Sequence, residues 1–334
     1  MSSGCFDVLG YSYSDRDVLR SWKDGFDYLP DKHPYKILSE SSMSKLDNLL
    51  DSATNALPWL FKDFLFGTHR KNILVITSFG TIRPTAYIQK TMNGAILHED
   101  ARYLIAGIEG LFDFNPDLQA DMLRRYLRIH GYDHVRVEGV KIKIPNASKL
   151  SSIVQLGSLL RRERELRKFK EEVMKEVVSK NCDVVLIPAI LDNVKQYFEL
   201  NRDLNDVLIS EMPTNPPNKA GLRLVYLLLD KARNFGVDVI HVNNIAKVQH
   251  TGQNIEGLII ETNEGVVRCE AQAYVLATGD LVGGGIKILD VNTEYKRILE
   301  PIFNIDIAEV VWRWSRLVEG CVQRKHPWNG PRNC

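Results

Sequence analysis

The chain has 334 residues, of which 44% are hydrophobic and 25% are charged, enough apolar content for one large core or two ordinary ones. Its 43 Lys and Arg residues nearly balance 42 Asp and Glu residues, so the overall charge favours neither a nucleic acid nor an acidic membrane as partner. No apolar run reaches the roughly 18 residues that span a bilayer. Five scattered cysteines without a C-x-x-C pair argue against a disulfide framework, an iron–sulfur cluster or a zinc site, and favour a reducing cytoplasm.

Short runs of β-branched and apolar residues, bounded by turns, predict buried strands. They lie at 72–79, 103–108, 183–190, 208–212 and 237–242. Helical patterns separate them, at 116–129, 149–179, 192–200 and 221–235. The first helix is the best defined, because Asn115 is a good N-cap and Pro116 suits the first helical position. This alternation of strands and helices indicates an α/β protein.

Two segments depart from the alternation. Residues 135–144 alternate apolar and charged side chains, which predicts a half-exposed strand with a bulge at Gly139. Residues 245–270 contain three short apolar runs separated by turn residues, which predict an antiparallel three-stranded meander. A further apolar run at 274–278 follows directly and is expected to be a strand of a central parallel sheet.

The run at 274–278 leads through Ala-Thr-Gly into three glycines at 283–285. In an open α/β sheet, ligands bind beyond the carboxyl ends of the strands, and glycines there let the backbone approach a phosphate or an aromatic ring. We interpret this segment as the edge of a nucleotide or flavin site. A glycine-rich turn that closes an ordinary sheet is the alternative.

Three further side chains are candidates for contact with an anionic ligand. Arg83 lies beside Pro84 after a predicted strand and suits a carboxylate or phosphate, although a solvated turn is the alternative. Arg223 lies near the start of the last helix, where the helix dipole disfavours a cation; a ligand, or a local carboxylate such as Glu211, would explain it. His33 is either near the ligand or structural.

Seven stretches of the sequence occur together in a characteristic order: SSGCFDVLG, HPYKIL, FGTIRPT, IAGIEGLFDF, VVLIPAI, MPTNPPNKAGLRL and YVLATGDLVGGGI with ILEPIFNID after it. On these stretches the chain resembles the B subunits of anaerobic glycerol-3-phosphate dehydrogenases, which are relatives of the flavoproteins with two dinucleotide-binding domains. The resemblance covers about residues 1–306.

The resemblance implies a flavin-dependent oxidoreductase subunit that carries FMN, or FAD, and relays electrons from the oxidation of glycerol 3-phosphate to dihydroxyacetone phosphate toward the quinone pool. It implies a catalytic flavoprotein subunit and an iron–sulfur, membrane-associated subunit as partners. The chain would then be cytoplasmic and peripheral at the inner face of the cell membrane through these subunits. Neither nucleic acid nor direct membrane insertion is expected.

Eight positions are candidate flavin-binding residues: six carry over from the SSG and ATG stretches of the family, and the glycine-rich loop adds the last two. These positions are Ser2, Ser3, Gly4, Ala277, Thr278, Gly279, Gly283 and Gly284. No catalytic residue and no metal ligand is predicted. The resemblance also places Arg83, Arg223 and His33 in family stretches, as candidates for substrate or anion contact.

The chain departs from the family pattern at both ends, because the glycine-rich strand-turn-helix and a second glycine-rich segment are not found. We expect an incomplete flavin-binding Rossmann-like domain, lacking its first strand-turn-helix, at 1–70 and 220–310, an inserted second α/β lobe at 71–219 and a divergent tail at 311–334. The chain alone should bind flavin weakly or not at all. Two alternatives stay open: a non-catalytic, truncated flavoprotein scaffold that binds a catalytic subunit, and an unrelated small-molecule enzyme.

Overall fold

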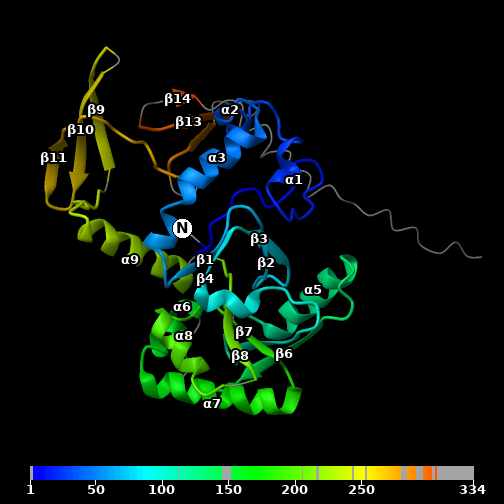
Figure 1. Ribbon diagram of the computed structural model, residues 1–334. Helices are drawn as coiled ribbons and strands as arrows, with labels where there is room; N and C mark the ends of the chain where they lie inside the picture. Colours follow the sequence, from blue (N-terminus) through cyan, green and yellow to red (C-terminus); the bar gives the residue numbers. More distant parts are fainter. Residues whose placement is uncertain are drawn as a thin grey trace, which may run out of the picture. The chain divides into compact units, whose positions relative to one another are not determined.

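The computed structural model describes residues 3–111, 113–144, 152–204, 206–215, 218–242, 244–252, 254–279, 284–290, 296–302 and 305–306. The chain forms two compact units, Ser2–Asn234 and Phe235–Cys334 (Figure 1). The expected tail at 311–334 lies outside the described residues. The sequence led us to expect that 1–70 and 220–310 together form one domain. This division stays a prediction, because the two units are separate bodies and each is described by itself.

The first unit is built around a four-stranded parallel sheet with the order β6-β5-β7-β8. Its strands are β5 (Arg102–Ile108), β6 (Arg136–Ile142), β7 (Val184–Pro188) and β8 (Leu208–Met212). In chain order this is 2-1-3-4, so the direction of winding reverses between β5 and β7, as in doubly wound Rossmann-like sheets. The predicted α/β fold class is confirmed.

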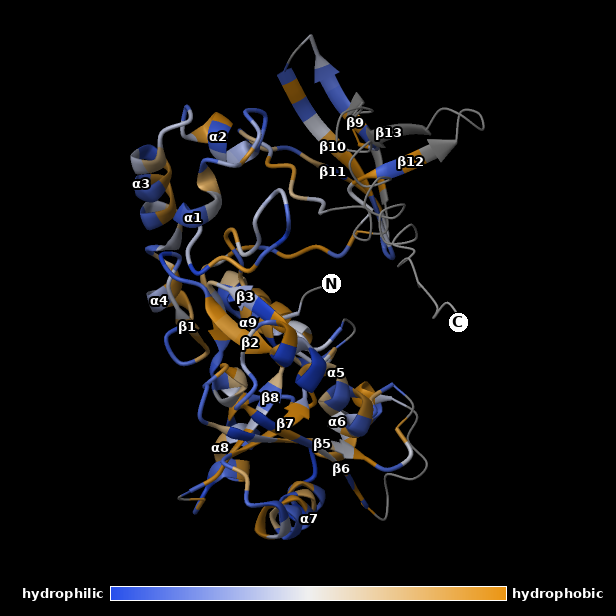
Figure 2. Ribbon diagram, turned by 90° about the vertical axis from the view of Figure 1, so that its right-hand side faces the viewer, coloured by the Kyte–Doolittle hydropathy of each residue, from blue (hydrophilic) through white to orange (hydrophobic). Residues whose placement is uncertain are grey.

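Helices follow the strands and pack against this sheet. They are α5 (Pro116–Ile129), α6 (Ile153–Leu159), α7 (Glu163–Lys180), α8 (Val194–Asn201) and α9 (Lys219–Asn234). As predicted, the Asn115 side chain caps α5 by accepting from the backbone N–H of Asp117. The central strands β5 and β7 are almost wholly buried and apolar (Figure 2), so they form the main core of this unit.

Two details of the sheet differ from the sequence expectation. The β5–β6 register runs without interruption through the pair of Ile105 with Gly139, so the predicted bulge is wrong. Gly139 is needed instead for close packing, because a Cβ there would lie 2.6 Å from the carbonyl oxygen of Pro116. The predicted helix at 149–179 is two helices, α6 and α7. Between the two helices, the Gln196 side-chain amide donates to the Leu160 carbonyl oxygen at 2.8 Å.

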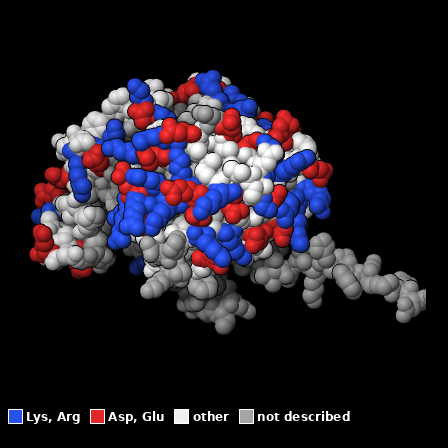
Figure 3. All heavy atoms as spheres, turned by 90° about the horizontal axis from the view of Figure 1, so that it is seen from below, with Lys and Arg blue, Asp and Glu red and all other residues white. Residues whose placement is uncertain are grey.

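The exposed face of α7 carries mixed charge, as the sequence predicted. On it Lys175 pairs with Glu172 at 2.6 Å, and at its border Lys168 pairs with the buried Glu165 at 3.6 Å. The view from below, where α7 lies in Figure 1, shows blue and red side chains interspersed (Figure 3). Such a surface is typical of solvated helices.

The segment that precedes the sheet contains short elements and two antiparallel strand pairs. These are α1 (Lys23–Phe26), α2 (Pro34–Leu38), α3 (Met43–Thr54), α4 (Leu57–Leu60), β1 (Leu65–Gly67), β2 (Ile73–Ile76), β3 (Ile82–Thr85), β4 (Tyr87–Gln89) and the 3-10 helix η1 (Lys90–Ala95). Strand β1 pairs with β4, and β2 with β3. A small core of Trp22, Phe26, Leu29 and Leu46 joins α1 to α3.

The second unit is antiparallel. Strands β9 (Asn244–Thr251), β10 (Asn254–Thr262) and β11 (Gly265–Cys269) form the predicted meander. Strands β12 (Lys287–Asp290), β13 (Lys296–Glu300) and β14 (Ile305–Asp306) form a second three-stranded sheet. Across the described residues, we find no helix with the length and apolar character needed to cross a membrane.

The strands predicted at 237–242 and 274–278 are not formed. Val275, expected in a sheet interior, is 91% exposed. A β-strand is stabilised by hydrogen bonds to a neighbouring strand, and no described segment pairs with either run. Both runs are apolar, as the prediction required, but no strand among the described residues pairs with them.

Candidate functional site

Buried charged side chains gather at the carboxyl edge of the parallel sheet. Glu211 is the fourth residue of β8, and Asp192 follows β7 after a short loop. Helix α9 brings two cations to them, and a third comes from the turn after α6. We call this group the carboxyl-edge cluster; it consists of the buried Glu211, Lys219 and Arg223, the partly buried Asp192 and the exposed Arg161. In doubly wound sheets this edge is where ligands bind.

Arg223 is only 5% exposed, and protein atoms accept from all three of its guanidinium nitrogens. Its Nη2 lies 2.5 Å from one carboxylate oxygen of Glu211, and its Nη1 lies 3.2 Å from the other. The side-chain oxygen of Gln89 accepts from Nε at 3.0 Å and from Nη2 at 2.9 Å. Thr91 and the Leu191 carbonyl oxygen accept the remaining bonds.

This arrangement contains the local carboxylate that the sequence offered as one of two explanations for Arg223. The carboxylate of Glu211 compensates the charge of Arg223, and Glu211 also accepts from the backbone N–H of Leu191 at 2.6 Å. The N–H groups of the guanidinium donate to protein atoms, and the ion pair with Glu211 joins α9 to β8. The role of Arg223 in binding an anion stays a prediction.

Asp192 is the second anchor of the cluster. Lys219 lies 2.7 Å from its carboxylate and is itself 5% exposed, and Arg161 donates to the same carboxylate. Burial alone would raise the pKa of Asp192, but the hydrogen bonds from Arg161 and Lys219 outweigh it and lower the pKa below its ordinary value. Asp192 is therefore a carboxylate that fixes the first turn of α9.

Arg83 lies within β3, opposite Val75 of β2, and not on a free turn. Its Nη1 donates to the Ser3 hydroxyl at 2.8 Å, and its Nη2 pairs with the Asp7 carboxylate. Burial opposes the charge of the guanidinium, but Asp7 outweighs it and raises the pKa of Arg83. The solvated-turn alternative is therefore wrong: Arg83 is 28% exposed at its side chain and holds the first described residues of the chain.

Gly4 lies where only glycine fits. Its φ is +82°, and a Cβ would lie 2.2 Å from the Gln89 amide nitrogen and 2.9 Å from Cβ of Ala220. The same amide nitrogen donates to the Gly4 carbonyl oxygen at 3.1 Å. Ser3 and Gly4 therefore lie beside the residues that hold Arg223. Ser2, the third residue of this predicted flavin segment, lies outside the described residues.

The other predicted flavin residues belong to the second unit. Ala277 and Gly279 are exposed, and Gly279 has a φ of +84°. Gly285 lies close to this segment, because a Cβ on it would lie 2.3 Å from the Gly279 carbonyl oxygen and 2.7 Å from the Thr278 hydroxyl. Gly284 is exposed with a φ of +82°, whereas Gly283 lies outside the described residues.

Among the described residues, neither unit by itself forms a crevice that fits a flavin with these residues. In the first unit the space beside Gly4 is filled by Gln89 and Ala220. In the second, the Ala277–Gly279 segment is exposed and does not end a paired strand. The predicted common cleft of Arg83 and Gly279 spans two separate bodies and stays a prediction.

His33 has a local structural role. It is the N-cap of α2, where its Nδ1 accepts from the backbone N–H of Tyr35 at 3.1 Å. Partial burial lowers the pKa of His33. These observations fit the structural alternative stated for this histidine.

The chain has relatives among curated proteins over most of its length. The probable anaerobic glycerol-3-phosphate dehydrogenase B subunit of Halobacterium salinarum is 28% identical over 319 residues, which cover 92% of this chain and 70% of that protein. The anaerobic glycerol-3-phosphate dehydrogenase B subunit of Actinobacillus pleuropneumoniae is 24% identical, with 92% and 71% covered, and that of Vibrio vulnificus is 26% identical, with 92% and 70% covered. The chain is a relative of these B subunits. No protein-family model and no solved structure matches it.

The relationship confirms the resemblance to the B subunits, but sequence reasoning missed most of the carboxyl-edge cluster. Of its members, Asp192, Lys219 and Arg161 were not singled out, nor was Gln89, which supports it. A signal for the cluster was present. Glu211 is a carboxylate inside the predicted buried strand at 208–212, and a buried carboxylate requires a buried cation or donors.

Proposed function

We propose that the chain serves as the B subunit of an anaerobic glycerol-3-phosphate dehydrogenase complex, which oxidises glycerol 3-phosphate to dihydroxyacetone phosphate. The observation that carries the proposal is the similarity to B subunits over 92% of the chain. A match of that extent includes both the sheet and the strand meander, and so it is not a shared motif alone. In this role the subunit relays electrons toward the quinone pool.

The proposed cofactor is FMN or FAD, and the proposed partners are a catalytic flavoprotein subunit and an iron–sulfur, membrane-associated subunit. Through them the chain would lie at the inner face of the cell membrane. The packing around Gly4 and the exposure of Ala277 and Gly279 support a flavin site that is completed only in the assembled complex. The isolated chain should then bind flavin weakly.

The same packing favours one second candidate, a non-catalytic scaffold that binds a catalytic subunit. In that case the space beside Gly4 belongs to Gln89 in every state of the protein. The carboxyl-edge cluster would then serve only to hold α9 on the sheet. Electron relay and scaffolding predict different flavin contents for the same assembled complex.

The experiment is reconstitution with the catalytic and iron–sulfur subunits. The chain alone is dialysed against FMN and FAD, and the purified assembly is measured for flavin content and for quinone reduction that depends on glycerol 3-phosphate. Extra flavin in the assembly, together with activity that needs this chain, supports the relay. Assembly without extra flavin supports the scaffold. Failure to assemble or to restore activity contradicts both.

Arg83 offers a sharper test inside that assembly. If the hydrogen-bonded side chains of Ser3 and Arg83 contact the flavin phosphate, Arg83→Ala removes a charge-assisted hydrogen bond worth about 1.5–3 kcal/mol. The affinity for flavin should then fall at least tenfold. Arg202→Ala is the matched control, because Arg202 pairs with Glu199 at the surface. Equal flavin affinity in both variants would remove Arg83 from the proposed site.

A further inference from the structure

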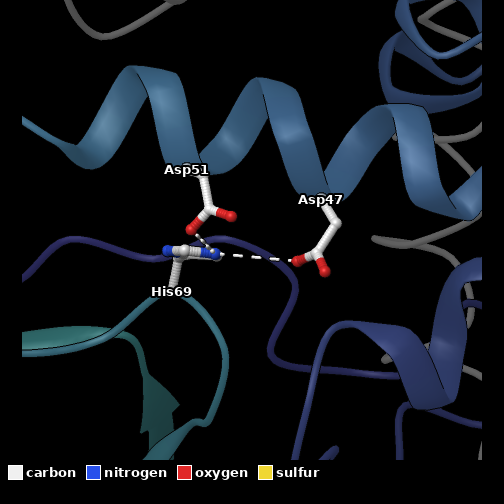
Figure 4. Close-up of side chains that lie close together, drawn as sticks. All are labelled: Asp47, Asp51 and His69. Carbon is white, nitrogen blue, oxygen red and sulfur yellow. Dashed lines mark ion pairs between the residues drawn. The ribbon is translucent and has the colours of Figure 1, made fainter.

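A buried histidine faces two aspartates in the part of the first unit that precedes the parallel sheet (Figure 4). Asp47 and Asp51 lie one turn apart on α3, and His69 lies in the turn after β1. His69 is 5% exposed. Its Nε2 lies 3.4 Å from Oδ1 of Asp51 and 3.8 Å from Oδ1 of Asp47.

The hydrogen bonds around His69 indicate which ring nitrogen carries its proton. The Thr54 hydroxyl donates to the Leu50 carbonyl oxygen at 2.8 Å, so its own hydrogen is already used. The 3.0 Å contact between Thr54 and Nδ1 of His69 therefore has Nδ1 as the donor. In the neutral imidazole the lone pair is then on Nε2, which points toward the two carboxylates.

Both atoms at the centre of this group are buried and lack a hydrogen-bond partner, namely Nε2 of His69 and Oδ1 of Asp47. Two buried atoms that turn their lone pairs toward each other, with no hydrogen between them, are unfavourable unless a cation lies there. The separations of 3.4 and 3.8 Å exceed those of ordinary N–H···O hydrogen bonds. They match donor atoms placed about 2.0–2.2 Å from a common metal ion.

We propose that Asp47, Asp51 and His69 bind a divalent transition-metal ion of the zinc class, with water completing the coordination. One imidazole nitrogen and two carboxylate oxygens are ordinary zinc ligands. The sequence argument against a zinc site considered cysteines only. This site contains none, and it becomes visible only when the turn after β1 is folded against α3.

The outer oxygens of both carboxylates are held by cations, which orient the ligands. Lys23 lies 2.7 Å from Oδ2 of Asp47, and Arg70 donates to both oxygens of Asp51, to Oδ2 at 2.7 Å and to Oδ1 at 2.9 Å. Their positive charge also weakens the attraction for a dication, so binding should be moderate. The bound ion would pin α3 to the turn at 68–71, and its role is therefore structural.

The test uses the full chain, stripped with a chelator and dialysed against Zn²⁺. We expect one equivalent of bound zinc and a melting temperature that rises with zinc concentration. Asp47→Asn should weaken zinc binding at least about tenfold, while its amide oxygen still accepts from Lys23. His69→Gln should do the same, and Asp47→Asn keeps the test valid if the buried glutamine prevents folding.

Asp63→Asn is the matched control, because Asp63 is an exposed carboxylate paired with Lys90 in the same unit. Co²⁺ as a second probe distinguishes this site from the free thiols of Cys5, Cys182 and Cys269, since bound Co²⁺ should show no thiolate charge-transfer band.

Zinc binding that Asp47→Asn leaves unchanged, or a thiolate charge-transfer band from bound Co²⁺, overturns the proposal. So does a metal-independent gain of stability on acidification that His69→Gln abolishes, since Nε2 would then carry a proton.

Discussion

The ion pair of Arg223 and Glu211 is an example of charge buried in a sheet interior and fully compensated there. Glu211 is 0% exposed and Arg223 5% exposed. Burying such a pair gives little net stability, but removing one partner leaves the other charge without compensation. Sequence reasoning found Arg223 and named Glu211 as its alternative partner. It could not find Gln89 or Thr91, because nothing in the sequence brings 89–91 close to 223.

We predict that Glu211→Gln destabilises the protein by about 3–5 kcal/mol, because the Arg223 charge stays buried without its counter-ion. The measurement is the free energy of unfolding in urea. Glu199→Gln is the matched control, since Glu199 forms a surface pair with Arg202 at 2.6 Å and should change stability by less than about 1 kcal/mol. Similar losses in both variants would show that Glu211 is not held as described.

Gly4 and Gly131 separate backbone strain from lack of space. Both have positive φ values, +82° and +80°, but a Cβ on Gly131 would meet nothing within 4 Å. We predict that Gly131→Ala costs only the strain of about 1–2 kcal/mol, and that Gly4→Ala costs about 1–3 kcal/mol more because of its clash with Gln89. Urea unfolding of both variants gives the difference directly. Equal losses would mean that Gln89 moves aside freely.

At the scale of elements, success of the sequence predictions depends on whether the signal is local. The strand predicted at 183–190 and the helix after Asn115 form close to where they were predicted, because a continuous apolar run and capping act through near neighbours. The bulge at Gly139 and the single helix at 149–179 are wrong for the opposite reason. Pro116 and Gln196, which decide those two places, are distant in sequence.

The loop after β7 should make part of the stability dependent on pH. The pKa of Asp192 is lowered from an ordinary value of 3.8 in the folded protein. A depressed folded pKa means that the pair with Arg161 and Lys219 contributes its full stability above about pH 4, and loses it as the pH falls through the lower, folded value. We predict that the free energy of unfolding of Asp192→Asn falls less steeply with acidification in this range.

The comparison is made by urea unfolding at a series of pH values for the parent chain and Asp192→Asn. At neutral pH the variant should be the less stable of the two, and the two curves should converge as the pH falls. Parallel curves would show that Asp192 contributes nothing to the acid dependence, and that the loop after β7 is held by other contacts.

At the scale of the whole molecule, composition and the alternation of strands and helices were enough for the α/β class, but not to predict which apolar runs pair as strands. The sequence placed 237–242 in a sheet because its apolar run reads as a buried strand. In the structure this segment is unpaired, and Val237 and Ile240 are 52% and 53% exposed. An apolar run specifies burial only when a partner surface covers it.

This exposed connection gives a prediction for the isolated chain. Phe235, the first residue of the second unit, is 59% exposed, and 237–242 has no regular secondary structure. Proteases cut such segments preferentially, so brief digestion with chymotrypsin should cleave near residue 235 before it attacks the parallel sheet. Mass spectrometry should then find a resistant fragment that ends close to Asn234, with α9 still held by Glu211 and Asp192.

Simultaneous loss of both units, or first cleavage inside the parallel sheet, would contradict the division into two units at residue 235. Protection of this connection in the reconstituted complex would place the partner subunits, or a cofactor, over the apolar run at 237–242.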